Sequence, residues 1–334
     1  MARIVGVFQT SHTPFCYRRP EAWNDARKGR PLRADVPFDD LETNRLKYAR
    51  IQASFAVLKR KLAEAGPDVI VIFGDDQLEC FDFSNFPAFS IYVGEEFEGN
   101  VVDQDAPIAA ERPLKPLQRA RLQGHPPLAV ALLTGLMKHG FDPAFSMAMP
   151  KPEEGIGHAI LRPVQSLTDL KTPIVPFLMN CYYAPQPTAE RCYRLGRAVR
   201  AIVEDFPDGL RVALVGSGGL WHTPSRPGAW LNEAFDEALL AHMAKGDIKA
   251  MAAHFDGYRI PESDASQDIS ARGRTVTGMP ALSGPQGGGT RETCNWIAAA
   301  GAVEGTTATI VDRVPIYASP VDTAYAYFNI DPSA

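Results

Sequence analysis

The sequence predicts an α/β fold in which helices flank a central mixed, mostly parallel sheet. Short apolar runs rich in Val, Ile and Phe end abruptly in polar or glycine-containing clusters, as the buried strands of parallel sheets do. Between these runs, apolar residues recur every three or four positions, which is the spacing of helices that pack on one face. Strands that alternate with helices along a chain are typical of α/β proteins.

Four apolar runs are the expected strands, and each is followed by side chains that can bind a ligand. The runs and the residues that follow them are 3–8 with His12, 68–73 with Asp76 and Gln77, 174–179 with Asn180, and 212–215 with His222. In open α/β sheets, ligands bind outside the carboxyl ends of the strands. We therefore expect these four strand ends to form the walls of one site.

Apolar periodicity predicts the helices that separate these strands. They cover residues 48–62, 127–138, about 188–204 and about 228–245, and a further helix begins near Glu292. Residues 18–40 and 258–289 are irregular and rich in Pro, Gly or charge. Loops of this length more often cover a site than divide domains. We expect one catalytic domain, 1–334, with both segments as long loops over its site.

Composition and charge limit the class of partner. The 334 residues are 45% hydrophobic and 22% charged, with a net charge of −5, which is ordinary for a globular protein. Without a concentrated positive region, a nucleic-acid or membrane partner is not expected, and a small molecule is. Five scattered cysteines without a CxxC pair and a short N-terminal apolar run favour a cytoplasmic protein.

Three of the seven histidines are candidates for chemistry. His12 and His222 follow strands beside small residues, and His158 lies in a Gly-Ile-Gly-His segment. Each could instead satisfy backbone groups in a turn, and Glu292 near a helix start is favourable in itself. Two imidazoles and one carboxylate are, however, the ligand set of non-haem Fe(II) enzymes that activate oxygen. No P-loop, dinucleotide fingerprint or Gly-x-Ser-x-Gly elbow is present in the sequence.

The order of these motifs resembles that of the class III extradiol dioxygenases, the superfamily of the protocatechuate 4,5-dioxygenase β subunit. The matching features are Ser11-His12, Pro67–Ile72, Phe81-Asp82, Gly157-His158-Ala159, Gly216–His222, Glu292 with Trp296, and Asp322-Thr323-Ala324. Arg19–Trp23 and Gly74–Gln77 are most similar to the branch around 3-O-methylgallate dioxygenases.

The resemblance implies a role for each candidate. His12 and Glu292 would bind Fe(II), His222 would be the acid/base that faces the substrate, and His158 would line the pocket near dioxygen or a substrate hydroxyl. Gln77 occupies the position of the second metal histidine of better-known members. Its carbonyl oxygen is a poorer donor for Fe(II) than an imidazole. The alternatives are that Asp76 or Glu79 supplies that ligand, that this branch holds its metal differently, or that iron chemistry has been lost.

The implied function is Fe(II)-dependent extradiol cleavage, by O2, of a catechol- or gallate-type aromatic ring, including methoxylated rings. We expect Asp76, Asn180 and Arg291 to contact the substrate, with Arg291 as the counter-charge for an anionic group. A homodimer is plausible for the family. Two other functions fit the same fold: a metal-binding interaction protein similar to the Memo family, and a non-oxidative metallohydrolase.

Overall fold

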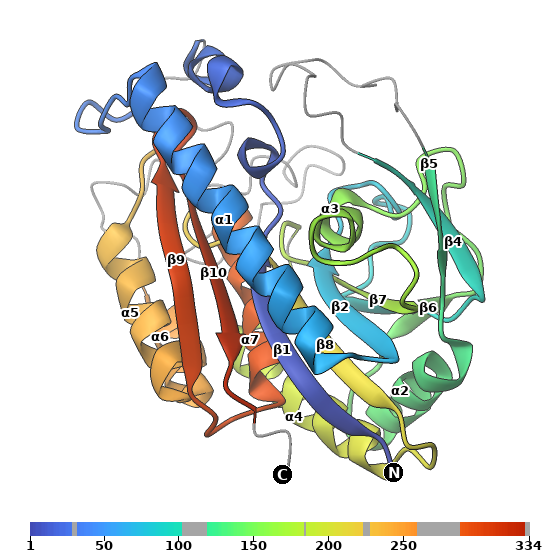
Figure 1. Cartoon of the computed structure of the whole chain (residues 1–334). Coiled ribbons are helices and arrows are strands. Elements are labelled where there is room, and N and C mark those ends of the chain that lie inside the picture. The colour runs from blue at the N-terminus through green and yellow to red at the C-terminus, as the bar shows by residue number, and fades with distance from the viewer. Residues whose placement is uncertain (29–31, 102–118, 184, 223–227, 259–287, 331–334) are drawn as a thin grey trace.

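The computed structural model describes residues 1–28, 32–101, 119–183, 185–222, 228–258 and 288–330. Its centre is an eight-stranded sheet with the strand order β6-β3-β7-β2-β8-β1-β10-β9. The four predicted strands lie in the middle and run parallel: β7 (Ile174–Met179), β2 (Val69–Asp75), β8 (Arg211–Gly218) and β1 (Arg3–Ser11). The predicted fold class, a mixed and mostly parallel sheet between helices, is confirmed (Figure 1).

The outer strands were not predicted. They are β3 (Phe89–Tyr92), β6 (Ala144–Ser146), β9 (Ala308–Ile316) and β10 (Val321–Phe328), and β4 (Glu96–Asn100) pairs with β5 (Arg119–Gln123) in a separate antiparallel sheet. β10 is antiparallel to both β1 and β9. Several of these strands are short or partly exposed, so they lack the continuous apolar run of a doubly covered strand.

Helices cover both faces of the main sheet. α1 (Leu41–Ala65) and α3 (His158–Leu167) lie on one face; α2 (Pro126–Lys138), α4 (Ala189–Asp205), α5 (Glu233–Lys245), α6 (Ile248–Gly257) and α7 (Thr293–Gly301) lie on the other (Figure 1). In β2, Val71 packs with the second group and Ile70 and Ile72 pack with the first. Alternate residues of a strand point to opposite faces, so this strand must be apolar throughout.

Local signals explain where the helices begin and end. The Asp40 carboxylate caps α1 by accepting from the Thr43 amide at 2.8 Å, and Gly66 ends the helix in the left-handed region, with φ 52°. The helix predicted from about residue 228 begins only at Glu233, because Asn232 caps it there.

Of the two expected loops, residues 18–40 contain a 3-10 helix, η2 (Pro20–Arg27), so this segment is less irregular than predicted. Most of the other expected loop, 258–289, lies outside the described residues. No helix in the described part of the chain combines the length and apolar character that a membrane span requires.

Candidate metal centre

The carboxyl ends of the parallel strands bring the main predicted residues together. His12 follows β1, Asp75 is the last residue of β2, and Glu292 ends the 3-10 helix η5 (Gly288–Glu292) just before α7. All three are buried, and their ligand atoms lie within 4.8 Å of one another. Among the described residues, this is the group of His, Cys, Asp and Glu whose atoms could hold one metal ion.

The imidazole of His12 is held in an orientation that suits a metal ligand. Its Nδ1 lies 2.9 Å from Ser217 Oγ, while Nε2 lies 3.1 Å from Glu292 Oε2 and 3.6 Å from Asp75 Oδ1. Nε2 is buried and makes no aligned hydrogen bond with either carboxylate. Divalent cations bind imidazole nitrogen and carboxylate oxygen atoms. Nε2 of His12, which is buried without a hydrogen bond, and the carboxylates of Asp75 and Glu292 are therefore a suitable set of ligands.

Electrostatics also leave this cluster short of positive charge. Burial and the charge of Glu292 raise the pKa of Asp75 to about 7. Burial alone would raise the pKa of Glu292, but His222 and His12 hold it well below its usual range. Burial opposes protonation of His12, yet Glu292 and Asp75 outweigh it and raise the pKa of His12. A metal cation bound between these groups would balance the charge of the carboxylates in place of the protons on the imidazoles.

Gln77 lies in the same cluster, as the resemblance implied. Its amide Nε2 is 3.1 Å from Asp75 Oδ2, 3.4 Å from Glu292 Oε1 and 3.5 Å from His158 Nε2. Rotating the amide by half a turn would exchange its nitrogen for its carbonyl oxygen at this place. Gln77 can therefore present either a donor to the carboxylates or an oxygen ligand to a metal.

His222 approaches the cluster from the loop that follows β8. Its Nδ1 lies 3.0 Å from the Leu220 carbonyl, which selects the tautomer that carries its proton on Nδ1. Its Nε2 faces Glu292 Oε1 at 3.2 Å and the Tyr182 hydroxyl at 3.4 Å. A Cβ on Gly289 would lie 1.8 Å from this Nε2, so only glycine lets η5 pass so close to the ring.

His158 completes the group as the first residue of α3. Its Nδ1 contacts both carboxylate oxygens of Glu79 at 2.8 Å, and its ring meets that of His12 edge to face. Burial lowers the pKa of His158 to about 4 despite the nearby Glu79. The ring is therefore neutral near pH 7, with Nδ1–H donated to Glu79 and the lone pair of Nε2 facing Gln77.

The three expected substrate-binding residues make other contacts. Both oxygens of Asp76 accept hydrogen bonds from loop amides, those of Leu78, Cys80 and Phe81. The Asn180 side chain bonds with the backbone of Tyr183. The Arg291 guanidinium donates to the Pro187 carbonyl and lies 5.7 Å from the Phe255 ring. These bonds shape the loops around the cluster, and direct substrate contact by the three residues stays a prediction.

Several members of the site were not predicted from the sequence. Asp75 was not predicted as a metal ligand, because the resemblance directed that role to Gln77. Tyr182, whose hydroxyl donates to Glu292 Oε1, follows the third predicted strand. Ser217 holds His12, and Asn295 donates to Asp75 Oδ1 at 3.3 Å. Their positions at strand ends and beside Glu292 were visible in the sequence, but their partners lie far away along the chain.

Residues 39–327 match the model of one protein family, described as the catalytic LigB subunit of aromatic ring-opening dioxygenase. Two curated relatives are named 2,3-dihydroxyphenylpropionate/2,3-dihydroxicinnamic acid 1,2-dioxygenase. The one from Photorhabdus laumondii is 30% identical over 179 residues, 53% of this chain and 50% of the relative; the one from Klebsiella pneumoniae is 27% identical over 173 residues, 51% and 48%. A gallate dioxygenase from Pseudomonas putida is 36% identical over 103 residues, 30% of this chain and 29% of the relative.

The matched segments thus span half or less of the length of these curated relatives. A solved structure of an uncharacterized protein, JW3007 from Escherichia coli K12, overlaps with 96% of this chain and 98% of its own. Its TM-score is 0.49 and its sequence identity is 14%, a likeness too low to bear on fold or function.

Proposed function

The chain belongs to the family of the catalytic LigB subunit of aromatic ring-opening dioxygenases, and on this premise we propose that it is an extradiol dioxygenase that uses Fe(II) and O2. The family match confirms the resemblance that the motifs indicated, whereas the closer likeness to 3-O-methylgallate dioxygenases stays a prediction. The relatives' names support a catechol- or gallate-type aromatic as the substrate. The observation that carries the proposal is the buried cluster of His12, Asp75 and Glu292 with His222 beside it.

In this proposal, His12, Asp75 and Glu292 hold the iron, and Gln77 supplies an amide oxygen. Fe(II) bound there would supply open positions at which two adjacent oxygens of the substrate and dioxygen meet. The Ser217 hydroxyl fixes the His12 ring, and the Tyr182 hydroxyl orients the Glu292 carboxylate. Such supporting bonds keep the donor atoms in place before the substrate arrives.

His222 is the proposed general base. With Nδ1–H anchored on the Leu220 carbonyl, the neutral ring has its lone pair on Nε2, on the side of Glu292. It can take the proton of a substrate hydroxyl there and return it later in the reaction. Neutral His158, fixed by Glu79, can accept a hydrogen bond at Nε2 but has no proton to give from that atom.

The remaining predictions concern the whole protein. We propose one catalytic domain, because β1 and β10, from opposite ends of the chain, pair in the same sheet. All five cysteines are free and buried, which supports a reducing compartment such as the cytoplasm. The predicted homodimer is tested by light scattering on the purified chain.

Oxygen uptake is the decisive test. The protein is purified without oxygen, loaded with Fe(II), and supplied with protocatechuate, gallate, 3-O-methylgallate or catechol. We expect uptake that requires both iron and one of these diols, together with the absorbance of a ring-opened product. A folded, iron-loaded protein that consumes no oxygen with any diol would contradict the proposal. Hydrolytic activity with bound Zn²⁺ would favour the metallohydrolase instead.

A further inference from the structure

A short loop after β2, residues 76–81, brings two side chains to the same histidine. Gln77 Nε2 lies 3.5 Å from His158 Nε2, and the Glu79 carboxylate contacts Nδ1 of the same ring at 2.8 Å. Gln77 and Glu79 are only two positions apart in the chain, yet they reach the two different nitrogens of one imidazole. The backbone between them must therefore turn sharply.

Leu78 makes this turn in an unfavourable backbone conformation. Its φ is 68°, in the left-handed region, and Leu170 is the only other non-glycine residue with a positive φ in the described part of the chain. A residue with a Cβ is strained there, and such a conformation persists only where the surroundings hold it. The loop therefore needs contacts that keep Leu78 in place.

Asp76 supplies contacts from within the loop. Its buried carboxylate accepts from the amides of Leu78, Cys80 and Phe81, at 3.1, 2.7 and 3.2 Å. A carboxylate has no proton to donate, so it cannot satisfy the carbonyl oxygens of the same turn. Their donor has to come from another segment.

Lys151 supplies that donor. Its ammonium donates to the Leu78 carbonyl at 3.0 Å and to the Phe81 carbonyl at 3.1 Å. The side chain is half-buried, and a hydrogen bond from a charged donor is stronger than one between neutral groups. Lys151 thus ties the strained residue to the last residue of the loop.

Lys151 is itself fixed by the segment that leads to His158. Its carbonyl accepts from the Gly155 amide at 2.9 Å, and a Cβ on Gly157 would lie 2.6 Å from Glu79 Oε2. His158 follows directly as the first residue of α3. The residue that holds the loop and the ring that the loop contacts therefore belong to one short segment.

We propose that Lys151 is a positioning residue for the metal centre. Its ammonium holds Leu78 in the left-handed turn and thereby keeps the Gln77 amide in the cluster, 3.1 Å from Asp75 and 3.4 Å from Glu292. Without the ammonium, Leu78 would relax toward a negative φ and the Gln77 side chain would turn away. The inference rests on the proposed metal centre and deepens it, since Lys151 acts through Gln77 rather than by binding the metal.

Co²⁺ affinity tests the role of the ammonium. Co²⁺ is the probe because it takes nitrogen and oxygen ligands like those of the cluster and is stable in air. Lys151→Met keeps the length of the side chain but has no donor, and we expect it to bind Co²⁺ about tenfold more weakly than wild type. Lys151→Arg restores a charged donor and should recover most of the affinity. Competition with a metal-sensitive dye measures each variant.

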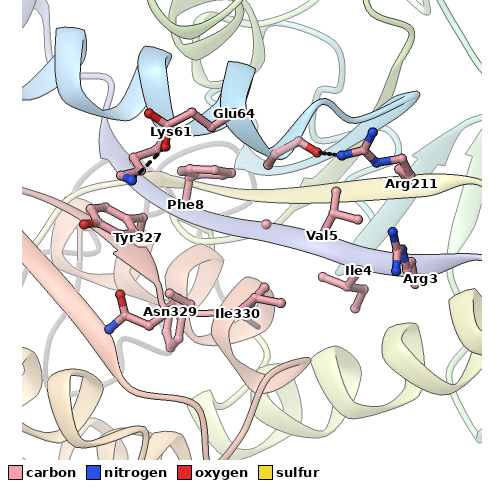
Figure 2. A pocket seen from close by; sticks show the side chains of 13 residues that line it. Arg3, Ile4, Val5, Phe8, Lys61, Glu64, Arg211, Tyr327, Asn329 and Ile330 are labelled. Carbon is pink, nitrogen blue, oxygen red and sulfur yellow. Dashed lines mark hydrogen bonds and ion pairs between the residues drawn. The ribbon is translucent and has the colours of Figure 1, made fainter. Parts of the chain in front are cut away.

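Lys61→Met is the matched control. Lys61 is also half-buried, and its ammonium pairs with Glu64 at 2.7 Å. Figure 2 shows this pair in the wall of a cavity near the amino end of β1, whereas the metal cluster lies beyond the carboxyl end of that strand. The variant should therefore bind Co²⁺ like wild type. Equal losses of affinity in the two Met variants would overturn the proposal.

A double variant tests whether Lys151 acts through Gln77. In the Gln77→Ala background, Lys151→Met should cause little further loss of Co²⁺ affinity, because the side chain that the loop positions is gone. Deuterium exchange of the metal-free protein gives an independent readout. The amides of Leu78, Cys80 and Phe81 should exchange about tenfold faster in Lys151→Met, the effect of losing one charge-assisted hydrogen bond.

The results separate this proposal from the proposed function. Normal Co²⁺ affinity or unchanged exchange in Lys151→Met, or losses that multiply in the double variant, would overturn the role of Lys151 alone. Absent oxygen uptake by a protein with the expected Co²⁺ losses would contradict only the dioxygenase. A wild-type chain that binds no Co²⁺ would overturn both. Melting curves verify folding, and Lys151→Gln, with a smaller expected loss, replaces Lys151→Met if that variant unfolds.

Discussion

Two pairs of buried carboxylates in the described part of the chain have different surroundings. Asp75 and Glu292 share the cluster with His12, whose Nε2 lies 3.6 Å and 3.1 Å from them. Asp236 of α5 and Asp322 of β10 form the other pair, and both are fully buried. Burial and the charge of Asp322 raise the pKa of Asp236 well above its usual range.

The second pair is already neutralised by the protein. Arg313 donates to Asp322 Oδ2 at 2.7 Å, and Asp236 accepts the Trp221 amide with both oxygens, at 3.0 and 3.1 Å. The buried Oδ1 of Asp322 has no other hydrogen-bond partner, so it is satisfied when Asp236 keeps its proton and donates it there. This pair holds in place the loop that carries His222.

The group that faces a buried carboxylate pair, rather than the acids themselves, determines whether the pair can bind a metal. An arginine stays charged at any pH that a protein tolerates, so the pair of Asp236 and Asp322 is closed to metals. An imidazole can lose its proton and offer a lone pair to a cation. The pair of Asp75 and Glu292 is therefore the one that can bind a metal. We call it the open pair and call the pair of Asp236 and Asp322 the closed pair.

Removing one carboxylate from each pair should change a different property of the protein in each case. Glu292→Gln keeps the shape of the side chain but loses its charge, and we expect metal affinity and oxygen uptake to fall by about 100-fold or more. Asp322→Asn should lower the free energy of unfolding while the metal content stays at the wild-type level. Elemental analysis after dialysis and denaturant titration measure the two effects. Full metal content in Glu292→Gln would contradict the assignment of the cluster.

His222→Ala separates catalysis from metal binding within the cluster. Loss of a general base should reduce turnover about 10²- to 10⁴-fold, and the bound metal should remain because the ligands are intact. The exposed His139 at the end of α2 provides the matched control, His139→Ala, which should leave turnover unchanged. Unchanged oxygen uptake by His222→Ala would remove this residue from the mechanism.

Ser217→Ala tests how much metal affinity depends on the hydrogen bond that positions the His12 ring. The variant leaves His12 Nδ1 without its partner at 2.9 Å, so the ring can rotate, and we expect metal affinity to fall about 10- to 100-fold. Ser54→Ala is the control, because Ser54 is also buried and bonds to a carbonyl, that of Arg50, but lies on α1. Competition with a metal-sensitive dye measures both. Equal affinities in the two variants would indicate that Ser217 does not position the ligand.

The sequence predicted the central strands and most of the metal cluster better than it predicted the pair of Asp236 and Asp322, for a physical reason. His12, Gln77 and His222 stand at the ends of apolar runs, where the topology of a parallel sheet brings distant residues together. Asp236 and Asp322 lie on α5 and on the unpredicted strand β10, and no local pattern connects them. Asp75 was not assigned as a ligand, because the resemblance directed that role to Gln77 and because the distance from Asp75 to His12 depends on the register of β1, β8 and β2.

The closed pair itself is tested by the pH dependence of stability. Asp236 has a raised pKa in the folded state, so the folded chain binds a proton that the unfolded chain has lost above about pH 4. Wild-type stability should therefore decline as pH rises above that value, by up to about 1.4 kcal/mol per pH unit until the folded pKa is reached. Asp236→Asn cannot ionise, yet its amide can still donate to Asp322, so its unfolding free energy should decline less.

Urea titrations of wild type and Asp236→Asn at about pH 5 and about pH 8 measure this difference, since that interval lies above the unfolded pKa of an Asp. Asp75 contributes the same pH dependence to both proteins, so subtracting one from the other isolates the contribution of Asp236. Asp25→Asn, which alters an exposed acid paired with Lys28, should follow wild type. If Asp236→Asn and wild type lose stability equally, then Asp236 is ionised in the folded chain. Arg313 alone would then balance both carboxylates, and the contrast with the open pair would rest on the imidazoles only.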